Sequence, residues 1–209
     1  MPADRSIVLA GDSIFDNAAY TGGEPDVTTH LNSLLPPGSK ATLVAVDGAT
    51  VSGLPSQLRR LPKDATHLVI SIGGNDALAN IDLLSLRATG SAEVLQVFAT
   101  RIQGFERAYR AAIADASTHQ LPVTLCTIYN GALDTSIATI ARLALALFND
   151  VILRTAAERR LDVIELRAIC CDASDYANPI EPSGSGGLKI ATAIARAVAR
   201  VGPYSRMFA

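Results

Sequence analysis

The sequence "SIVLAGDSIFDN" at residues 6–17 joins an apolar run to a polar turn. Residues 6–10 are continuously apolar after the first serine, which is typical of a strand buried on both faces of a parallel sheet. Gly11, Asp12 and Ser13 then end the run abruptly. A serine at such a strand-to-helix turn can project its hydroxyl into a crevice beside backbone N–H groups, as activated nucleophiles do. Ser13 could equally cap a helix, because serine and aspartate both favour that position.

Four further apolar runs, at 41–46, 67–73, 123–129 and 162–166, alternate with segments of helical character. The helical segments are predicted at about 25–35, 53–61, 92–119, 134–160 and 185–200. Continuously apolar strands separated by helices predict an α/β/α sandwich around a parallel sheet. By analogy with flavodoxin-like folds we expect five strands in the order 2-1-3-4-5, within one domain spanning 1–209.

Composition narrows the class of protein. The chain has 209 residues, 49% hydrophobic and 18% charged, with a formal net charge of -2, as expected for a globular domain. No Lys/Arg cluster is present, so we expect neither nucleic acid nor an anionic membrane surface as the partner. The apolar stretch 140–153 is interrupted by Arg142, Asn149 and Asp150, and is expected to fall short of a membrane span. Because strand sequence begins within the first residues, we expect no signal peptide and a cytoplasmic location.

The three cysteines are Cys126, Cys170 and Cys171. Their odd number and the lack of CxxC spacing speak against a disulfide framework or a zinc site. Cys126 lies in an apolar run and is interpreted as a small buried hydrophobe. The adjacent pair at 170–171 is interpreted as two core-facing thiols, with a redox switch as the alternative.

Five loops follow the predicted strands, at 11–17, 47–53, 73–78, 130–135 and 167–187. Ligands of open parallel sheets bind beyond the carboxyl ends of the strands, so these loops should converge on the functional crevice. Asn75 in "GGND" could aim its amide at a developing oxyanion, and Gly48 could bring a bare backbone N–H to the same point. Each could also be an ordinary turn residue.

Taken together, "GDSI" at 11–14, Gly48 and "GGND" at 73–76 resemble the SGNH/GDSL hydrolase family. The stretch 148–166 is also similar to that family's penultimate helix and last strand. The resemblance implies a flavodoxin-like sandwich that hydrolyses esters, acetyl groups on sugars, or lipids, without a cofactor. It implies that Ser13 is the nucleophile, and that the Ser13 N–H, the Gly48 N–H and the Asn75 amide form the oxyanion hole.

The sequence departs from the family in its last block, where the family has an aspartate and a histidine base. Aligning "NPIEPSGSGGLKIATAI", at 178–194, puts Asn178 at the aspartate position and Glu181 at the histidine position. We therefore predict Glu181 as the base, with its pKa raised by burial, and Asn178 as its orienter. Asp12 and Asp76 are candidate supporting carboxylates.

The three histidines are not expected to replace the missing base. His67 opens the third predicted strand and His119 precedes the fourth, so both should lie at the amino edge of the sheet. A strand of six residues is about 20 Å long, far beyond hydrogen-bond reach of Ser13. His30 falls in the first predicted helix, which should run away from the crevice. All three are interpreted as surface or edge residues.

Two hypotheses of function remain. The first is a hydrolase that cleaves a small acyl or acetyl ester through an acyl-serine intermediate, with a small-molecule ester as its only partner. The alternative is a catalytically silent module of the same fold that binds a sugar or small acid in the crevice. The sequence does not determine the acyl group or the alcohol of the substrate. It also leaves open whether the acyl group is transferred to an acceptor other than water, and what the oligomeric state is.

Two features of the last loop have alternative interpretations. Asp172 and Asp175, with acids of the other loops, could form an oxygen-ligand site for Mg²⁺ or Ca²⁺, although the spacings match no dedicated metal loop. We therefore predict no metal. "SGSGG" at 183–187 could hold a phosphate, but it lacks the Walker ending, and capping of the final helix is favoured.

Overall fold

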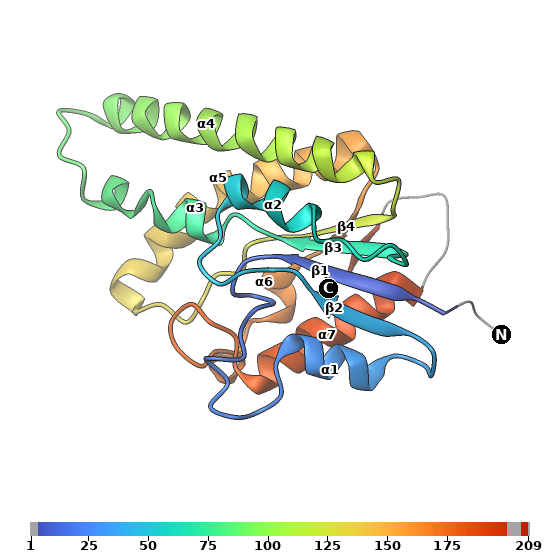
Figure 1. The fold of residues 1–209 in the computed structure, drawn as a ribbon. Helices are drawn as coiled ribbons and strands as arrows, with labels where there is room; N and C mark the ends of the chain where they lie inside the picture. Colours follow the sequence, from blue (N-terminus) through green and yellow to red (C-terminus); the bar gives the residue numbers. More distant parts are fainter. Residues whose placement is uncertain (1–3, 200–205, 209) are drawn as a thin grey trace.

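The structure is a computed structural model that describes residues 4–199 and 206–208. Its strands are all parallel and form one sheet in the order β2-β1-β3-β4-β5-β6 (Figure 1). Their bounds are Ser6–Gly11 (β1), Lys40–Leu43 (β2), His67–Ser71 (β3), Val123–Cys126 (β4), Asp162–Ile164 (β5) and Met207–Phe208 (β6). The predicted order of the first five strands is confirmed. The sequence did not indicate β6, because two residues carry no periodicity.

Helices cover both faces of the sheet. The α-helices are α1 (Val27–Leu34), α2 (Leu54–Leu58), α3 (Gly74–Leu78), α4 (Ser91–Thr118), α5 (Thr135–Arg159), α6 (Leu166–Ile169) and α7 (Gly184–Ala199). Three short 3-10 helices are η1 (Val51–Gly53), η2 (Ile81–Ser85) and η3 (Ala173–Asp175). α2, α4 and α5 lie on one side of the sheet, and α1 and α7 on the other (Figure 1). The five predicted helices correspond to α1, α2, α4, α5 and α7.

Both faces of β1 are buried, which explains its continuous apolar sequence. Val8 and Ala10 point into the core beneath α2, α4 and α5, whereas Ile7 and Leu9 point into the core beneath α1 and α7. All four side chains are fully buried. The strand that leads to Ser13 is therefore held from both sides, as expected for a central strand of a doubly covered sheet.

α5 meets the length and apolar composition of a membrane-crossing helix. We expected the polar residues Arg142, Asn149 and Asp150 to make this segment too short for a membrane span. By helix length and apolar composition that expectation is wrong. In the fold, Val151, Ile152 and Ala156 pack against the sheet, which accounts for part of the apolar content. Ile140 and Leu143 near its start are exposed.

Two buried carboxamides fix the carboxyl ends of the central strands. Gln57 of α2 accepts a hydrogen bond from the Gly11 N–H at 2.7 Å and donates one to the Gly11 carbonyl at 2.7 Å. Asn149 of α5 makes the same pair of bonds to Ile128, just after β4, at 2.7 and 2.8 Å. Each amide bonds both backbone groups of one buried residue, and of these four groups the Gly11 carbonyl also accepts a bond from the Val46 N–H at 3.1 Å. The sequence analysis did not identify either residue.

Replacing Gln57 should destabilise the protein and loosen the turn that carries Ser13. In Gln57→Ala, the Gly11 N–H loses its partner in the core, which costs about 1–3 kcal/mol, whereas the Gly11 carbonyl keeps the bond from the Val46 N–H. We expect the free energy of unfolding, measured by urea denaturation, to fall by about 1–3 kcal/mol. Arg59→Ala, at an exposed position beside the same helix, is the control. Equal stability of the two variants would contradict this role for Gln57.

Candidate active site

The turn after β1 requires glycine at position 11. Gly11 has φ +137°, and a Cβ there would lie 1.7 Å from the Ser71 carbonyl oxygen of β3. Only glycine avoids both the strain and the clash. The Asp12 N–H then donates to the same Ser71 oxygen at 3.0 Å. The chain therefore turns sharply against β3, and Ser13 follows with only 8% of its surface exposed.

The Ser13 hydroxyl donates a hydrogen bond of 2.9 Å to Oε1 of Glu181. The two residues lie 168 positions apart in the sequence, and Glu181 is only 6% exposed. The second carboxylate oxygen, Oε2, is buried and has no hydrogen-bond partner among the described residues. Buried polar atoms without partners are rare in native proteins, and they call for an explanation such as a catalytic role.

The loop that carries Glu181 is attached to its surroundings by several backbone bonds. Tyr176 and Pro182 form an antiparallel bridge, and the Ala177 N–H donates to the Glu181 carbonyl at 2.9 Å. The further bonds are Ala132 N–H to the Pro179 carbonyl, the Tyr129 hydroxyl to the Ile180 carbonyl, and the Asn17 amide to the Pro182 carbonyl. These contacts reach the loop from the segments after β1 and β4, so the position of Glu181 is fixed from two directions.

Asn178 orients Glu181 through the main chain. Its Oδ1 accepts hydrogen bonds from the N–H groups of Ile180 and Glu181, both at 2.9 Å. This is the Asx-type turn that asparagine commonly forms. The side chain makes no hydrogen bond to the Glu181 carboxylate. Asn178 therefore shapes the backbone of the loop and is not part of a relay to the carboxyl group.

Asn75 and Gly48 lie in neighbouring loops that are connected to each other. The Asn75 amide donates to the Ala49 carbonyl at 3.0 Å, which leaves its second hydrogen for a ligand. Gly48 has φ +73°, and the N–H groups of Ser13 and Gly48 donate to no other group in the described parts of the chain. Ser13 and Asn75 both line the cavity described below, whereas Gly48 does not.

The first loop is also bound to the second. The Asp47 N–H donates to Asp16 Oδ2 at 2.9 Å, and the Tyr20 hydroxyl donates to Asp47 Oδ2 at 2.6 Å. Asp76 of the third loop accepts from the Val51 N–H at 2.9 Å. The three loops therefore support one another through carboxylate-to-backbone bonds. Asp76 contributes to this support and does not line the cavity.

The histidines lie away from Ser13. His67 opens β3 and contacts the Thr66 hydroxyl through Nδ1 at 2.9 Å, and His119 follows the end of α4. His30 is half-buried beside Gly187 of α7, so its interpretation as a surface or edge residue is wrong. No described histidine lines the cavity or bonds to Ser13.

The pKa values of three carboxyl groups in the polar loops, those of Asp12, Asp76 and Glu181, are all raised. Burial raises the pKa of Glu181 above its usual 4.5, although the bond from Ser13 works the other way, and Asp47 adds to the rise. Burial raises the pKa of Asp12 from 3.8 to about 7, opposed by the Ile14 N–H and reinforced by the charge of Glu181. Burial also raises the pKa of Asp76. Perturbed carboxyl groups in a cleft are typical of active sites.

A cavity opens beside Ser13 and Glu181, and its space is about 990 Å³ when open solvent at its mouth is counted. Asp12, Ser13, Asn75 and Glu181 form what we call its polar wall, and Asn80 and Asn130 are further polar lining residues. The other walls are mostly apolar and come from α3, η2, α4, α5 and the segment after β4. A largely apolar hollow with a few convergent polar groups is the usual form of a small-molecule site.

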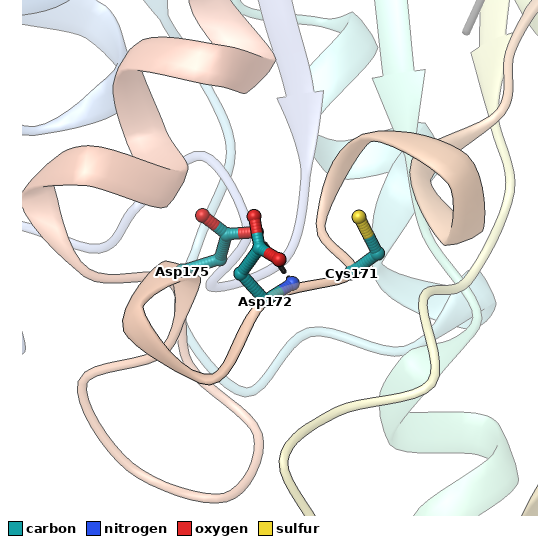
Figure 2. Close-up of side chains that lie close together, drawn as sticks. All are labelled: Cys171, Asp172 and Asp175. Atoms are coloured by element: carbon teal, nitrogen blue, oxygen red, sulfur yellow. Dashed lines mark hydrogen bonds between the residues drawn. The ribbon is translucent and has the colours of Figure 1, made fainter.

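Figure 2 shows the side chains of Cys171, Asp172 and Asp175 close together. Lys189 of α7 places its ammonium 2.7 Å from a carboxylate oxygen of each aspartate. Asp175 is completely buried, so this ion pair compensates its charge. Because the lysine ammonium already contacts both carboxylates and offsets part of their charge, the cluster does not fit a Mg²⁺ or Ca²⁺ site. Cys171 is exposed and free, which corrects its interpretation as a core-facing thiol.

The "SGSGG" segment caps α7. Ser183 precedes the helix and its hydroxyl oxygen accepts from the Gly186 N–H at 3.2 Å. A Cβ on Gly184 would lie 2.2 Å from Oε2 of Glu24, so a carboxylate already lies at this helix end. A second anion would be repelled there, and the capping interpretation is confirmed.

The sequence model of the GDSL-like lipase/acylhydrolase family matches residues 9–186. Among solved structures, a lipase of Streptomyces rimosus is 15% identical, with a TM-score of 0.70 over 92% of this chain and 99% of its own. A phospholipase A1 of Streptomyces albidoflavus is 17% identical, with a TM-score of 0.68 over 91% and 98%. An acetyl xylan esterase of Geobacillus stearothermophilus is 19% identical, with a TM-score of 0.65 over 97% and 100%. At these identities the likeness shows a shared fold. No curated protein matches the chain.

The raised pKa of Asp12 predicts a pH-dependent stability. The Asp12 carboxyl group loses its proton near pH 3.8 in the unfolded chain but only near pH 7 in the folded protein. The folded state is therefore favoured by the neutral carboxyl group below pH 3.8, and this contribution to the free energy of unfolding is lost as the pH rises to about 7. Asp12→Asn keeps an acceptor for the Ile14 N–H but cannot ionise. We expect it to raise the free energy of unfolding by up to about 4 kcal/mol at about pH 8, with the gain vanishing near pH 4.

Urea denaturation across this pH range measures the effect. The same substitution at Asp82, which is exposed in η2, is the control and should show no comparable gain. A pH-independent difference between Asp12→Asn and the wild-type protein would contradict the assignment of the shift to Asp12.

Proposed function

Because the chain belongs to the GDSL-like lipase/acylhydrolase family, we propose that it hydrolyses a small acyl or acetyl ester through an acyl-serine intermediate. Ser13 is the nucleophile and Glu181 the general base in this proposal. The observation that carries it is the 2.9 Å hydrogen bond from the Ser13 hydroxyl to Glu181, formed at the polar wall of the cavity. A nucleophile within hydrogen-bond reach of a base is the arrangement that covalent catalysis needs.

In the acylation step, Ser13 Oγ attacks the ester carbonyl while its proton moves to Oε1 of Glu181. The carbonyl oxygen becomes an oxyanion, and the Ser13 N–H, the Gly48 N–H and the free amide hydrogen of Asn75 are its proposed donors. A single preorganised donor of this kind is worth about 3–4 kcal/mol of transition-state stabilisation. Glu181 then returns the proton to the leaving alkoxide, and an alcohol departs.

In the deacylation step, a water molecule takes the place of the alcohol. Glu181 accepts a proton from the water as its oxygen attacks the acyl-serine carbonyl, and the same three donors hold the second oxyanion. When the intermediate collapses, the proton returns to Ser13 Oγ and a carboxylic acid is released. The balance of the cycle is one ester and one water converted to one acid and one alcohol, with no cofactor involved.

A carboxylate at its ordinary pKa is a weak base for removing a hydroxyl proton. Burial makes the Glu181 carboxylate a stronger base, because it raises the pKa of this group. General bases work best when their pKa approaches the operating pH. Burial raises the pKa of Glu181, and Asp47 adds a nearby negative charge in the same direction. The fixed loop around Pro179 and Pro182 keeps the carboxylate against Ser13 without solvent in between.

The substrate in this proposal is a soluble small-molecule ester. The lipase, the phospholipase A1 and the acetyl xylan esterase share this fold, and their names support an ester as the substrate. The kind of ester differs among the three names. The net charge of -2 and the lack of a basic cluster support the absence of nucleic-acid and membrane partners. The free thiols of Cys126, Cys170 and Cys171 support a reducing, cytoplasmic location.

Ser13→Ala tests the nucleophile. If Ser13 forms the acyl intermediate, hydrolysis of p-nitrophenyl acetate should fall by about a thousandfold or more in this variant. Ser52→Ala, an exposed serine in η1, is the control and should keep wild-type turnover. Turnover that survives in Ser13→Ala would remove the mechanism. An inactive wild-type protein would instead favour the second hypothesis, a catalytically silent binding module. That hypothesis stands because Glu181 occupies the position where the family has its histidine base.

Glu181→Gln tests the base. In the wild-type protein, kcat/KM should rise with pH as Glu181 loses its proton, with a midpoint above the ordinary value of 4.5. In Glu181→Gln that acidic limb should disappear and kcat/KM should drop by about a hundredfold or more. An unchanged pH profile would assign the base to another group.

Restoring the family pattern gives an independent measurement. In Glu181→His combined with Asn178→Asp, the acidic limb should move to the pKa of the new imidazole, about 6.5 when unperturbed. A limb that stays at its wild-type position would show that residue 181 is not the group that titrates.

A further inference from the structure

The cavity beside Ser13 extends well past the reacting atoms. A substrate whose acyl part is only an acetyl group would fill the polar wall and leave most of the hollow empty. The remaining walls are built by apolar side chains from four elements and one loop: Ala77, Leu78, Ile81, Leu84, Phe98, Ile128, Leu133, Ile137, Ala141, Ala144, Leu145 and Phe148. These groups offer contact to hydrocarbon. Beyond the polar wall, Asn80 and Asn130 are the lining residues with polar side chains, so most hydroxyls of a buried sugar would lack partners there.

We infer that this cavity is an acyl-chain pocket, and that the substrate carries an acyl chain of medium length. The inference rests on the proposed function, because it places the ester carbonyl at Ser13 and the acyl chain along α5. Glu181 lies at the polar end, where the negative charge of its carboxylate disfavours a free fatty-acid anion. A neutral ester is compatible with both ends of the pocket.

One face of α5 forms the long wall of the pocket. Ile137, Ala141, Ala144, Leu145 and Phe148 are spaced at i, i+4, i+7, i+8 and i+11, which places them on the same side of a helix. Two of the five are alanines, and they are flanked by larger side chains. The space beside Ala141 and Ala144 exists because these side chains are small, so they determine how long a chain the pocket accepts.

The pocket opens through apolar side chains. Leu78, Ile81 and Ile180 line it and are also 40%, 57% and 37% exposed. They come from α3, η2 and the Glu181 loop, which surround the entrance. An acyl chain can therefore enter along hydrocarbon contacts. The apolar entrance has no function if the natural substrate is an acetylated sugar.

The size of the expected preference follows from burial. Each methylene moved from water into an apolar pocket favours binding by about fourfold. If the contact is retained in the transition state, kcat/KM rises with each added methylene until the pocket is full. Octanoate has six methylenes more than acetate, so fourfold for each sets an upper limit of about four thousandfold. We expect p-nitrophenyl octanoate to exceed p-nitrophenyl acetate by at least about a hundredfold in kcat/KM, and dodecanoate to bring no further gain.

Graded substitutions at Ala144 test the inference. In Ala144→Val and Ala144→Phe, the ratio of octanoate to acetate kcat/KM should fall stepwise, by about threefold and about thirtyfold, as side-chain volume replaces chain volume. Ala146→Phe, on the exposed side of the same helix, is the matched control and should keep the wild-type ratio. Acetate as the best substrate of the wild-type protein, or an equal ratio in all four proteins, would overturn the inference.

A binding measurement separates this inference from the proposed function. In Ser13→Ala, calorimetry with the neutral methyl heptyl ketone should show binding that is lost in Ser13→Ala combined with Ala144→Phe and kept with Ala146→Phe. If no ester is hydrolysed but this pattern holds, the catalytic proposal fails and the pocket stands. If esters are hydrolysed but the ketone binds no better than acetone, the acyl-chain pocket fails and the catalytic proposal stands.

Discussion

The hydrogen bond between Ser13 and Glu181 is the contact on which the proposed chemistry depends, and it is costly to form. Both side chains are almost fully buried, and a carboxylate removed from water loses most of its hydration. The Ser13 hydroxyl replaces one hydration partner at Oε1, and Oε2 has no replacement among the described groups. The raised pKa of Glu181 is the direct consequence, because burial without full compensation disfavours the charged form.

The fold supplies the rigidity that this contact needs. β1 delivers Ser13 through a turn that only glycine permits at position 11, and Gln57 holds that turn from the opposite face. The Glu181 loop is bound by backbone groups after β1 and β4, and Asn178 fixes its local course. Because the constraints act on the backbone, they position whatever side chain occupies residue 181. The same scaffold could therefore present an imidazole or a carboxylate to the serine.

Much of this architecture could be predicted from the sequence, for identifiable reasons. Continuous apolar runs such as 6–10 predict buried parallel strands, and the parallel arrangement brings the polar loops after them to one edge. The resemblance to the GDSL family, aligned through the last block and the helix after it, implied that Glu181 lies opposite Ser13. The bonds of Gln57 and Asn149 could not be foreseen, because a single buried amide has no periodic signature. The sequence also could not show that Lys189 pairs with Asp172 and Asp175, or that Ala144 borders a cavity, since both depend on how α7 and α5 dock.

Replacing an imidazole by a carboxylate changes how charge moves during the reaction. A neutral imidazole that accepts the serine proton becomes a cation, so an ion pair is created with the oxyanion. In the proposed mechanism Glu181 becomes neutral when it accepts the proton, and the negative charge is transferred from its carboxyl group to the oxyanion. No net charge is created in a cavity whose other walls are apolar, which avoids the large cost of separating charges at low dielectric.

The same charge transfer places greater demand on the oxyanion donors. Without an adjacent imidazolium, the developing negative charge is stabilised only by backbone and amide dipoles such as those of Ser13 and Asn75. A neutral Asp12 is then favourable, because an ionised carboxylate in the same cavity would repel the oxyanion. The burial that raises the pKa of Asp12 to about 7 therefore acts in the same direction as the chemistry. An apolar acyl group that excludes water from the cavity would strengthen both effects.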